Sequence, residues 1–377
     1  MTRGAVLIVT SWILAILTLF AIGIGFRTGL DIKLTGYSLD RVKALYIAKA
    51  GIKRAVIEKW VEYAEGKSLG LDAFSELWAN NDECFKEIKV GDGTFTLSYS
   101  PGELDRSGKE ITLYGLEDET RKININIDSN MPVLKYLLMS FDLGLEEAEA
   151  IVSAIVDWRD VDNIPKVVSA AAGGAEDIYY QALETPYATS GEKFKTIEEL
   201  LLVKGITKGL YDKIADYITI FGEGGININT AREEALNAVF GIGYPELAAK
   251  IVDYRRGVDG KIGTDDDRHF TKGAFIIERG SRGLVEVKDL NDENWYGNIF
   301  GIRAVEYERI KELTQQEGLL STASDYYRAN VTACVDRVKK EITTVIKFDK
   351  PPEIREEGFS EEIPPPEIEY LYWREER

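Results

Sequence analysis

The chain has few of the residues that most catalytic and metal sites use. Its 377 residues include two cysteines, Cys84 and Cys334, and a single histidine, His269. The sequence contains no Cys–His pair, no histidine-rich metal motif and no Gly-x-Ser-x-Gly nucleophile motif. His269 stands in a polar stretch, which predicts a solvated loop residue. We therefore expect a protein that is not an enzyme.

Two cysteines leave their redox state open. If the globular part is exported, a disulfide between Cys84 and Cys334 is possible. The alternative is two buried free thiols. Both residues lie in segments that we interpret as strands or as flanking strands.

Net positive charge is also missing. The formal net charge is −18. Nucleic-acid binding depends on clustered lysine and arginine that contact phosphates, so we expect no nucleic-acid partner. An excess of carboxylates is instead suited to holding a cation.

The most informative feature that is present is an apolar N-terminal run. Residues 5–26 carry no charge, and about 22 residues at 1.5 Å each cover the roughly 30 Å of a bilayer core. Arg3 and Gly4 precede this run, whereas a secretory signal has its small-residue cleavage site after a shorter one. Cleavage after Gly4 would make Ala5 the new N-terminus. This order resembles a type IV prepilin signal, as in pilins and pseudopilins; the alternative is a simple signal anchor.

The predicted helix continues past the membrane segment. Downstream of Arg27, apolar residues recur at intervals of three and four and make one helical face. These residues are Leu45, Ala48, Ile52, Val56, Trp60 and Tyr63. Basic residues, Lys59 among them, fall largely on other faces. We expect one helix over residues 5–64, with its first half in lipid, its second half along a globular head, and glycines between 23 and 36 as points where it can bend.

A repeat with a period of about 100 residues organises the middle of the chain. Residues 123–128, Ile-Asn-Ile-Asn-Ile-Asp, have an echo at 225–231, Gly-Ile-Asn-Ile-Asn-Thr-Ala. Each copy leads into a helix, a glycine turn and a second helix. The expected helix caps are Asp128, Ser129 or Asn130 in the first copy and Asn229 or Thr230 in the second.

Residues 196–221, between the two copies, resemble a helix-hairpin-helix. They read as an apolar helix, a glycine turn and a second apolar helix. Such hairpins either bind DNA through backbone amides or serve as packing modules. The net charge of the chain favours packing.

An acidic loop follows the first copy of the repeat and gives the clearest chemical signal. Carboxylates stand at both of its ends: Asp157, Asp160 and Asp162, then Glu176 and Asp177. Ca²⁺ takes six to eight oxygen ligands from such groups, whereas Mg²⁺ prefers fewer carboxylates and more water. The pattern favours a calcium site over a solvated acidic loop.

A second acidic loop follows the second copy. Asp259, Asp265 and Asp267 alternate so that they can face one ion, and the glycines at 260 and 263 allow sharp turns. The spacing is not that of an EF-hand. A plain turn with solvated aspartates is the alternative, so the sequence predicts one or two calcium ions.

Strands are expected on either side of the repeat. Alternating or β-branched patterns predict strands at 93–99, 109–114, 283–287 and 326–348. The chain then becomes acidic and proline-rich from residue 350, which is typical of a linker. The aromatic end at 370–373 can dock as a last edge strand.

Together these features resemble the minor pseudopilin K family of type II secretion systems. The resemblance covers nearly the whole chain. It rests on the prepilin-like start, on the helix segment 39–52, on the loop from Asp157 to Tyr180, on the Ile-Asn-Ile-Asn-Thr-Ala segment and on Tyr-Trp-Arg-Glu at 372–375. The loop is the most specific of these segments.

The resemblance implies an α+β, pilin-like fold: a long N-terminal helix plus an antiparallel sheet, with a large α-helical insertion domain containing helix-hairpin-helix-like units. It also implies calcium in the insertion, which points to the carboxylates of the first loop. The expected segments are a prepilin leader at 1–4, a transmembrane half-helix at 5–26, pilin-like parts at 27–122 and 257–349, the insertion at 123–256 and an acidic tail at 350–377.

The implied function is that of a minor pseudopilin at the tip of the pseudopilus, which supports export of folded proteins across the outer membrane. The implied partners are the I and J minor pseudopilins, a prepilin peptidase and the inner membrane, with the head in the periplasm of a Gram-negative-type envelope. The fifth residue of the expected mature chain is Val9, where most pilin-like subunits carry Glu. The alternatives are a membrane-anchored helix-hairpin-helix DNA receptor of the competence type and a minor pilin of a type IV pilus.

Overall fold

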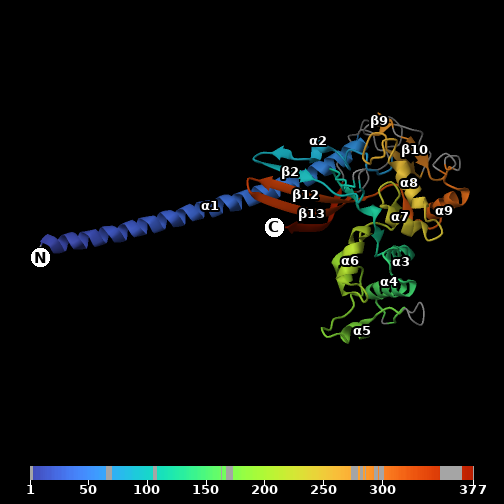
Figure 1. The fold of residues 1–377 in the computed structure, drawn as a ribbon, viewed down its shortest axis with the longest axis horizontal. Coiled ribbons are helices and arrows are strands. Elements are labelled where there is room, and N and C mark those ends of the chain that lie inside the picture. The colour runs from blue at the N-terminus through green and yellow to red at the C-terminus, as the bar shows by residue number, and fades with distance from the viewer. Residues whose placement is uncertain are drawn as a thin grey trace.

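A single long helix joins an exposed apolar segment to a globular head (Figure 1). The computed structural model describes residues 3–64, 70–104, 108–162, 164–166, 173–272, 279–280, 283–284, 286–292, 296, 301–348 and 367–376. Helix α1 (Arg3–Ala64) is continuous for 62 residues, so the N-terminal glycines do not interrupt it. The leader residues Met1 and Thr2 and the tail at 349–366 lie outside the described residues.

The first half of α1 has the length and composition of a membrane span. An 18-residue window in this helix reaches a mean hydropathy of 2.5 with none of the window buried inside the head. In the described part of the chain, no other helix meets these criteria. Large apolar side chains such as Leu7, Trp12 and Phe26 are more than half exposed. The prediction of a lipid-embedded first half is consistent with this exposure.

An antiparallel sheet packs against the second half of α1. Its strands lie in the order β1 (Ile88–Val90), β2 (Gly93–Leu97), β12 (Tyr326–Val335), β13 (Val338–Phe348) and β14 (Ile368–Glu376), with β3 (Glu117–Asp118) pairing β12. Alternating residues of β12 are buried, as the period of two requires. The expected pilin-like arrangement of helix and sheet is confirmed, and the aromatic C-terminus forms the expected edge strand, β14.

The helix packs tightly against the sheet at Gly51. A Cβ there would lie 2.8 Å from the Phe95 ring and 3.1 Å from Val331, so the residue has to be small. Ala48, Ile52 and Val56 are buried as the predicted face requires, whereas Leu45 and Trp60 are only partly buried. The Tyr63 side chain lies outside the described residues.

The prediction that Lys59 lies away from the buried face of α1 is wrong, because its side chain is only 1% exposed. Its ammonium group forms an ion pair with Asp72 and lies 4.5 Å from the centroid of the Trp78 ring. Asp72 also accepts hydrogen bonds from the Ser324 amide and the Tyr327 hydroxyl. The end of α1 is thus fixed to the head by a buried charge and not only by apolar contacts.

The helical part of the head forms two neighbouring lobes beyond the sheet (Figure 1). Two short elements, α2 (Asp82–Phe85) and η1 (Glu119–Arg121), lie near the sheet. The elements of the helical part are β4 (Ile123–Asn124), η2 (Asp128–Asn130), α3 (Met131–Ser140), α4 (Leu145–Arg159), α5 (Asp177–Gln181), η3 (Ile197–Leu202), α6 (Lys208–Ile214), η4 (Ala215–Tyr217), β5 (Ile218–Thr219), β6 (Ile226–Asn227), α7 (Glu233–Phe240), α8 (Leu247–Arg255), β7 (Arg268–Thr271), β8 (Arg279–Gly280), β9 (Gly283–Leu284), β10 (Glu286–Asp289), α9 (Ala304–Gln315) and β11 (Leu320–Ser321). Parallel two-stranded pairs join β4 to β5, β6 to β11 and β7 to β10.

The helical part is longer than predicted. Buried residues from Ile123 to Leu320 form one core cluster, separate from the cluster between α1 and the sheet. The expected boundary at residue 256 is therefore too early, because Phe270, Leu290 and Ile310 belong to the helical core. The predicted strand at 283–287 also contributes to local pairs, β8 with β9 and β7 with β10, and not to the main sheet.

The duplicated unit predicted from the sequence is present as α3–α4 and α7–α8. Helix α3 begins after Asn130, one of the predicted caps, although the Asn130 side chain makes no capping bond. In the second copy the predicted caps are wrong, because α7 begins after Arg232, which also makes no side-chain capping bond. The predicted strand at 109–114 is reduced to isolated bridges, Tyr99 with Leu113 and Leu104 with Glu110. The side chain of Asn229, one of the predicted caps, instead bonds to the backbone of Phe270.

The prediction for His269 is corrected, and one of the two alternatives left open for the cysteines is found. His269 is buried on β7, where its Nε2 lies 2.9 Å from the Ser75 hydroxyl, and burial lowers its pKa to about 4. Cys84 and Cys334 are both free thiols. Cys84 lies in the short helix α2, with Sγ 3.2 Å from an Arg54 guanidinium nitrogen, and Cys334 is exposed on β12.

Candidate metal centre

Three of the predicted ligands meet where α4 ends and α5 begins. Asp157 lies in the last turn of α4, Asp160 is the residue after its end, and Glu176 precedes α5. One carboxylate oxygen from each lies within 4.8 Å of the others. Within the described residues, no other group of three or more candidate ligands lies so close together. The first acidic loop therefore does close on itself, although residue 163 and residues 167–172 lie outside the described part.

Asp157 is the most deeply buried residue of this group. It is fully buried, and its two carboxylate oxygens accept hydrogen bonds from the Lys166 amide at 3.1 and 3.2 Å. Gly174 lies against it so closely that a Cβ would overlap the carboxylate. Burial raises the pKa of Asp157, and the nearby charge of Asp160 acts in the same direction. The site thus holds an acidic group in a place that disfavours its ionised form.

Glu176 is the residue that most clearly requires a partner. It is 2% exposed, and neither carboxylate oxygen has a hydrogen-bond partner; Asp160 Oδ1 also lacks one. Burial, followed by the charges of Asp157 and Asp160, raises the pKa of Glu176 to about 7. Buried polar atoms are nearly always paired, so these oxygens are directed at a group that would satisfy them. A hard divalent cation, bound by oxygen ligands, fits this donor set.

Asp162 and Asp177 lie outside the group of three. Asp162 is exposed and its Oδ1 accepts from the Ile164 amide at 2.8 Å. Asp177 Oδ1 accepts from both the amide and the hydroxyl of Thr189, at 2.8 and 2.9 Å. In these hydrogen bonds both aspartates hold the backbone of neighbouring loops.

The predicted second site is arranged differently. Asp259, Asp265 and Asp267 do not form a group of the kind seen in the first loop, as far as the described residues extend. Asp267 Oδ2 accepts from the Gly263 amide at 2.8 Å, and burial raises the pKa of Asp267 to about 7. Asp266, which the sequence did not single out, accepts from the amides of Val258 and Asp259. Of the carboxylates that were expected to face an ion, Asp267 and Asp259 thus accept from backbone amides, the latter from the Lys261 amide at 2.7 Å.

An aromatic cluster covers the first loop. The Trp158 ring packs edge-on against Tyr180, with centroids 5.3 Å apart, and Tyr187 lies 5.3 Å from Tyr180. Burial raises the pKa of Tyr180 to about 12, so its hydroxyl stays protonated and donates or accepts as a neutral group. The Trp at 158 and the Tyr pair at 179–180 were visible in the sequence, but their mutual contacts were not.

The turn of the hairpin at 196–221 makes its hydrogen bonds to other parts of the same chain. Its first helix is the 3₁₀ helix η3 and its second is α6. The Lys204 amide donates to the Tyr180 hydroxyl at 3.1 Å, and the Ile206 amide donates to the Val203 carbonyl. In a DNA-binding hairpin, amides of this turn would face phosphate. The interpretation as a packing module agrees with these contacts.

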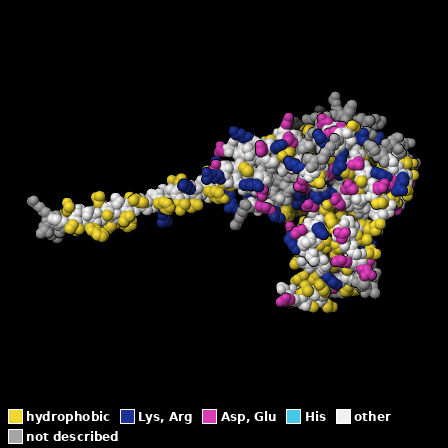
Figure 2. All heavy atoms as spheres, in the orientation of Figure 1, with side chains coloured by type: hydrophobic (Ala, Val, Ile, Leu, Met, Phe, Trp, Pro, Cys, Tyr) yellow, Lys and Arg dark blue, Asp and Glu magenta, His cyan; other side chains and the backbone are white. Residues whose placement is uncertain are grey.

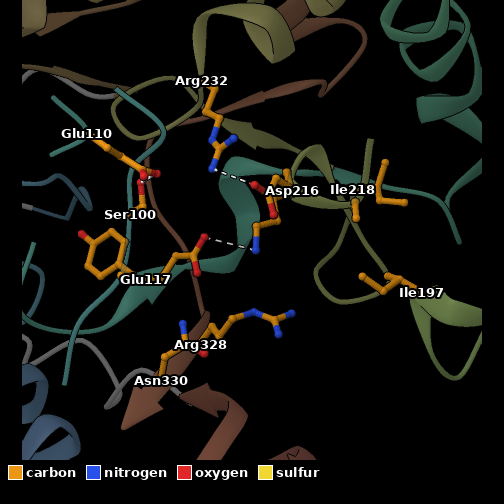
Figure 3. A pocket seen from close by; sticks show the side chains of 12 residues that line it. Ser100, Glu110, Glu117, Ile197, Asp216, Ile218, Arg232, Arg328 and Asn330 are labelled. Atoms are coloured by element: carbon orange, nitrogen blue, oxygen red, sulfur yellow. Dashed lines mark hydrogen bonds and ion pairs between the residues drawn. The ribbon is translucent and has the colours of Figure 1, made fainter. Parts of the chain in front are cut away.

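A polar pocket of about 290 Å³ lies between the sheet and the helical part (Figure 3). Its charged side chains pair with one another: Arg232 with Asp216 at 3.4 Å, and Lys122 with Glu117 at 3.2 Å. Arg328 makes two hydrogen bonds to the buried Glu119, at 2.7 and 2.8 Å. The Arg328–Glu119 pair joins β12 to η1, so the pocket lies at a junction that ion pairs hold together.

Comparisons with known proteins agree on one family. The family model described as "Type II secretion system (T2SS), protein K" matches residues 117–223. Type II secretion system protein K of Pectobacterium carotovorum subsp. carotovorum is 29% identical over 245 residues, which cover 63% of this chain and 70% of that protein. The protein K of Aeromonas hydrophila is 24% identical over 303 residues, covering 77% and 80%.

A solved structure shows the same fold. A chain from the crystal structure of the GspK-GspI-GspJ complex of the enterotoxigenic Escherichia coli type 2 secretion system aligns with a TM-score of 0.60. The alignment covers 91% of this chain and 99% of that chain at 16% sequence identity. The arrangement of long helix, sheet and helical insertion is thus shared over nearly the full length.

Proposed function

Because the chain belongs to the type II secretion system protein K family, we propose that it is a minor pseudopilin that supports export of folded proteins across the outer membrane. The observation that carries this proposal is the architecture. One helix runs from an exposed apolar segment to a pilin-like antiparallel sheet, and a helical part is inserted between the strands of that sheet. The solved relative shares this fold over 91% of the chain. The chain is accordingly a structural component of a secretion machine and not an enzyme.

The exposed half of α1 anchors the protein in a membrane with the head on the periplasmic side. Figure 2 shows apolar side chains around this half and basic side chains where the helix meets the head. We place the anchor in the inner membrane. Beyond the anchor, α1 still exposes large apolar residues: Leu34, Leu39, Val42 and Tyr46 are each at least half exposed. An exposed apolar helix face of this kind fits the helices of neighbouring subunits, and GspI and GspJ are the subunits in the solved relative's complex.

The shape of the head supports a particular position for this subunit. The helical part lies at the end of the head away from the N-terminus (Figure 1), where a further subunit would stack in a fibre. Such bulk favours a place at the tip of the pseudopilus. The absence of a glutamate at Val9 favours the same place, because a subunit in the shaft would pair that carboxylate with the N-terminal amine of a neighbour.

Immunogold labelling of overproduced fibres tests the tip position. Labelling confined to one end of each fibre is expected. Labelling along the fibre length would refute the proposal. A variant with Val9→Glu and the helical part deleted should enter the shaft, which distinguishes exclusion by shape and charge from low abundance.

We also propose that the first acidic loop binds one calcium ion through Asp157, Asp160 and Glu176. Three carboxylates in close contact, with buried oxygens that have no partner, support this proposal. When bound, the ion would supply positive charge that lets all three groups ionise together. At a calcium concentration a hundredfold above the dissociation constant, binding would add about 2.7 kcal/mol to the free energy of unfolding.

Thermal unfolding of the full chain in detergent, with calcium and with chelator, tests the calcium site. The melting temperature should rise with calcium in the wild type and in Asp162→Asn, whose side chain lies outside the group. Asp160→Asn should lose most of the rise. Equal melting temperatures with and without calcium in the wild type would show that the loop does not bind the ion.

The two alternative functions are not favoured. A DNA receptor would need an accessible hairpin turn, but the Lys204 amide is already bonded to Tyr180. A type IV minor pilin shares the long helix and sheet, but the matched family and both named relatives are type II secretion proteins.

A further inference from the structure

A lysine beside the acidic loop directs its ammonium group to backbone carbonyl oxygens and not to a carboxylate. Lys204 lies in the turn between η3 and α6 and is half-buried. Its Nζ lies 3.3 Å from the carbonyl oxygen of Gly174 and 3.5 Å from that of Gly173. The same Nζ lies 4.9 Å from the centroid of the Tyr179 ring. An ammonium group close to buried carboxylates would ordinarily neutralise one of them, whereas these contacts direct it to the backbone and an aromatic face.

The backbone that Lys204 contacts forms one side of the candidate metal centre. Gly174 lies directly against the Asp157 carboxylate, with no room for a Cβ. Its amide donates to the Lys166 carbonyl at 2.8 Å, and the Lys166 amide donates to Asp157. A shift of Gly173 and Gly174 would therefore move both the backbone over Asp157 and the residue that follows two positions later, Glu176.

The same turn also holds the chain on the other side of Glu176. The Lys204 amide donates to the Tyr180 hydroxyl at 3.1 Å, and the Tyr187 hydroxyl donates to the Leu202 carbonyl at 2.8 Å. Tyr180 lies on α5, which begins directly after Glu176. Glu176 thus sits between two segments, 173–174 and 179–180, that one hairpin turn fixes.

We propose that Lys204 is a positioning residue for the calcium site, which holds the Gly173–Gly174 backbone so that Glu176 stays directed at Asp157 and Asp160. The inference rests on the calcium binding proposed above. It gives the hairpin between the two repeat copies a role: the hairpin braces the metal loop from outside and contributes no ligand. Groups that orient metal ligands in this way typically change metal affinity by about 10- to 100-fold when removed.

Calorimetric titration of calcium into the full chain in detergent tests the proposal, with a matched control on the same hairpin. Lys208 is an exposed lysine that pairs with Asp212 and lies 5.4 Å from the centroid of the Tyr211 ring, so Lys208→Met removes the same charge and the same kind of ring contact away from the loop. Lys204→Met should weaken calcium binding by about tenfold or more, and Lys208→Met should not. Lys204→Arg, which keeps donors for the two carbonyls, should recover part of the affinity. Equal affinities for the two methionine variants, or tighter binding in Lys204→Met through loss of charge repulsion, would overturn the proposal.

Hydrogen–deuterium exchange of the calcium-free chain gives a readout that does not depend on the ion. Amides of residues 173–180 should exchange faster in Lys204→Met than in Lys208→Met, while the exchange of α3 and α7 stays the same in both. Unchanged exchange in this segment would refute the positioning role. If the two variants show the expected exchange difference but the wild type binds no calcium, the proposed metal function is refuted and the positioning of the backbone is not.

Discussion

The side-chain amide of Asn229 holds the backbone of Phe270 from both sides. Its Nδ2 donates to the Phe270 carbonyl at 2.9 Å, and the Phe270 amide donates to its Oδ1 at 2.8 Å. In the first copy of the repeat, Asn126 holds Phe194 in the same way, at 3.0 and 2.8 Å. Each asparagine thus ties the start of its copy to the chain that returns after the acidic loop, which makes the loop ends a fixed part of the fold.

Asn229→Ala should destabilise the protein strongly. The substitution would leave the amide and the carbonyl of the buried Phe270 without this partner, at about 1–3 kcal/mol for each group. We expect a loss of about 3 kcal/mol in the free energy of unfolding, measured by urea denaturation. Asn237→Ala, at a half-buried position within α7, is the control and should be neutral or slightly stabilising, because alanine favours helix. Similar effects of the two substitutions would contradict the clamp.

The sequence revealed this repeat but not the role of its asparagines. The Ile-Asn-Ile-Asn pattern and the two helix pairs are local features, so the period could be recognised from them. The partners of Asn126 and Asn229 lie 68 and 41 residues further along the chain. A prediction from neighbouring residues could not include them and therefore assigned Asn229 as a helix cap. Contacts of this length depend on the fold and are not visible in spacing.

The same limit explains how the candidate site was only partly predicted. The carboxylates at both ends of the first loop were recognisable, because α4 ends there and charge accumulates. The repeat also suggested a second site, but the two copies have diverged: Asp157 is buried among carboxylates, whereas its counterpart Asp253 is 72% exposed and pairs with Arg256. Lys204 escaped notice because it contributes no ligand atom.

Lys59→Met should reveal the buried charge at the end of α1. Removing the ammonium group leaves Asp72 buried beside Trp78 without its cation, and breaking such a pair costs about 3–5 kcal/mol. Lys53→Met, on the same helix but exposed, should change the free energy of unfolding by less than about 0.5 kcal/mol. Urea denaturation of both variants measures the difference. If Lys59→Met behaves like Lys53→Met, the ion pair is not what fixes the helix end.

The single histidine should make stability depend on pH. Burial lowers the pKa of His269 to about 4, from 6.5 in an unfolded chain, so protonation favours the unfolded state. The stability that the folded chain gains from keeping His269 neutral is fully present above pH 6.5 and is lost as the pH falls toward 4. Between pH 7.5 and 5, the wild type should lose about 2 kcal/mol more stability than His269→Gln.

His269→Gln is a suitable comparison because glutamine can still bond to Ser75 but does not titrate. Asp267, two residues before, has a pKa raised to about 7 and shifts stability in the opposite direction, but it is present in both proteins and cancels in the difference. Parallel pH profiles for wild type and variant would show that His269 is not held neutral in the folded state.

The mature protein should begin at Ala5. Arg3 and Gly4 precede the apolar run, and α1 extends back to Arg3, so the bond to be cut lies at the exposed, membrane-proximal end of a helix and not in a folded domain. Nothing lies within 4 Å of the position that a Cβ on Gly4 would take, so replacement by a bulky residue leaves the fold unchanged and tests the peptidase alone. N-terminal sequencing and intact mass after co-expression with a prepilin peptidase should show loss of residues 1–4 in the wild type and in Thr2→Ala, and retention of Met1 in Gly4→Val. An uncleaved wild-type chain, or a cut beyond Phe26 that removes the apolar segment, would mean that this segment is not a prepilin signal and that the helix cannot carry the protein into a pseudopilus.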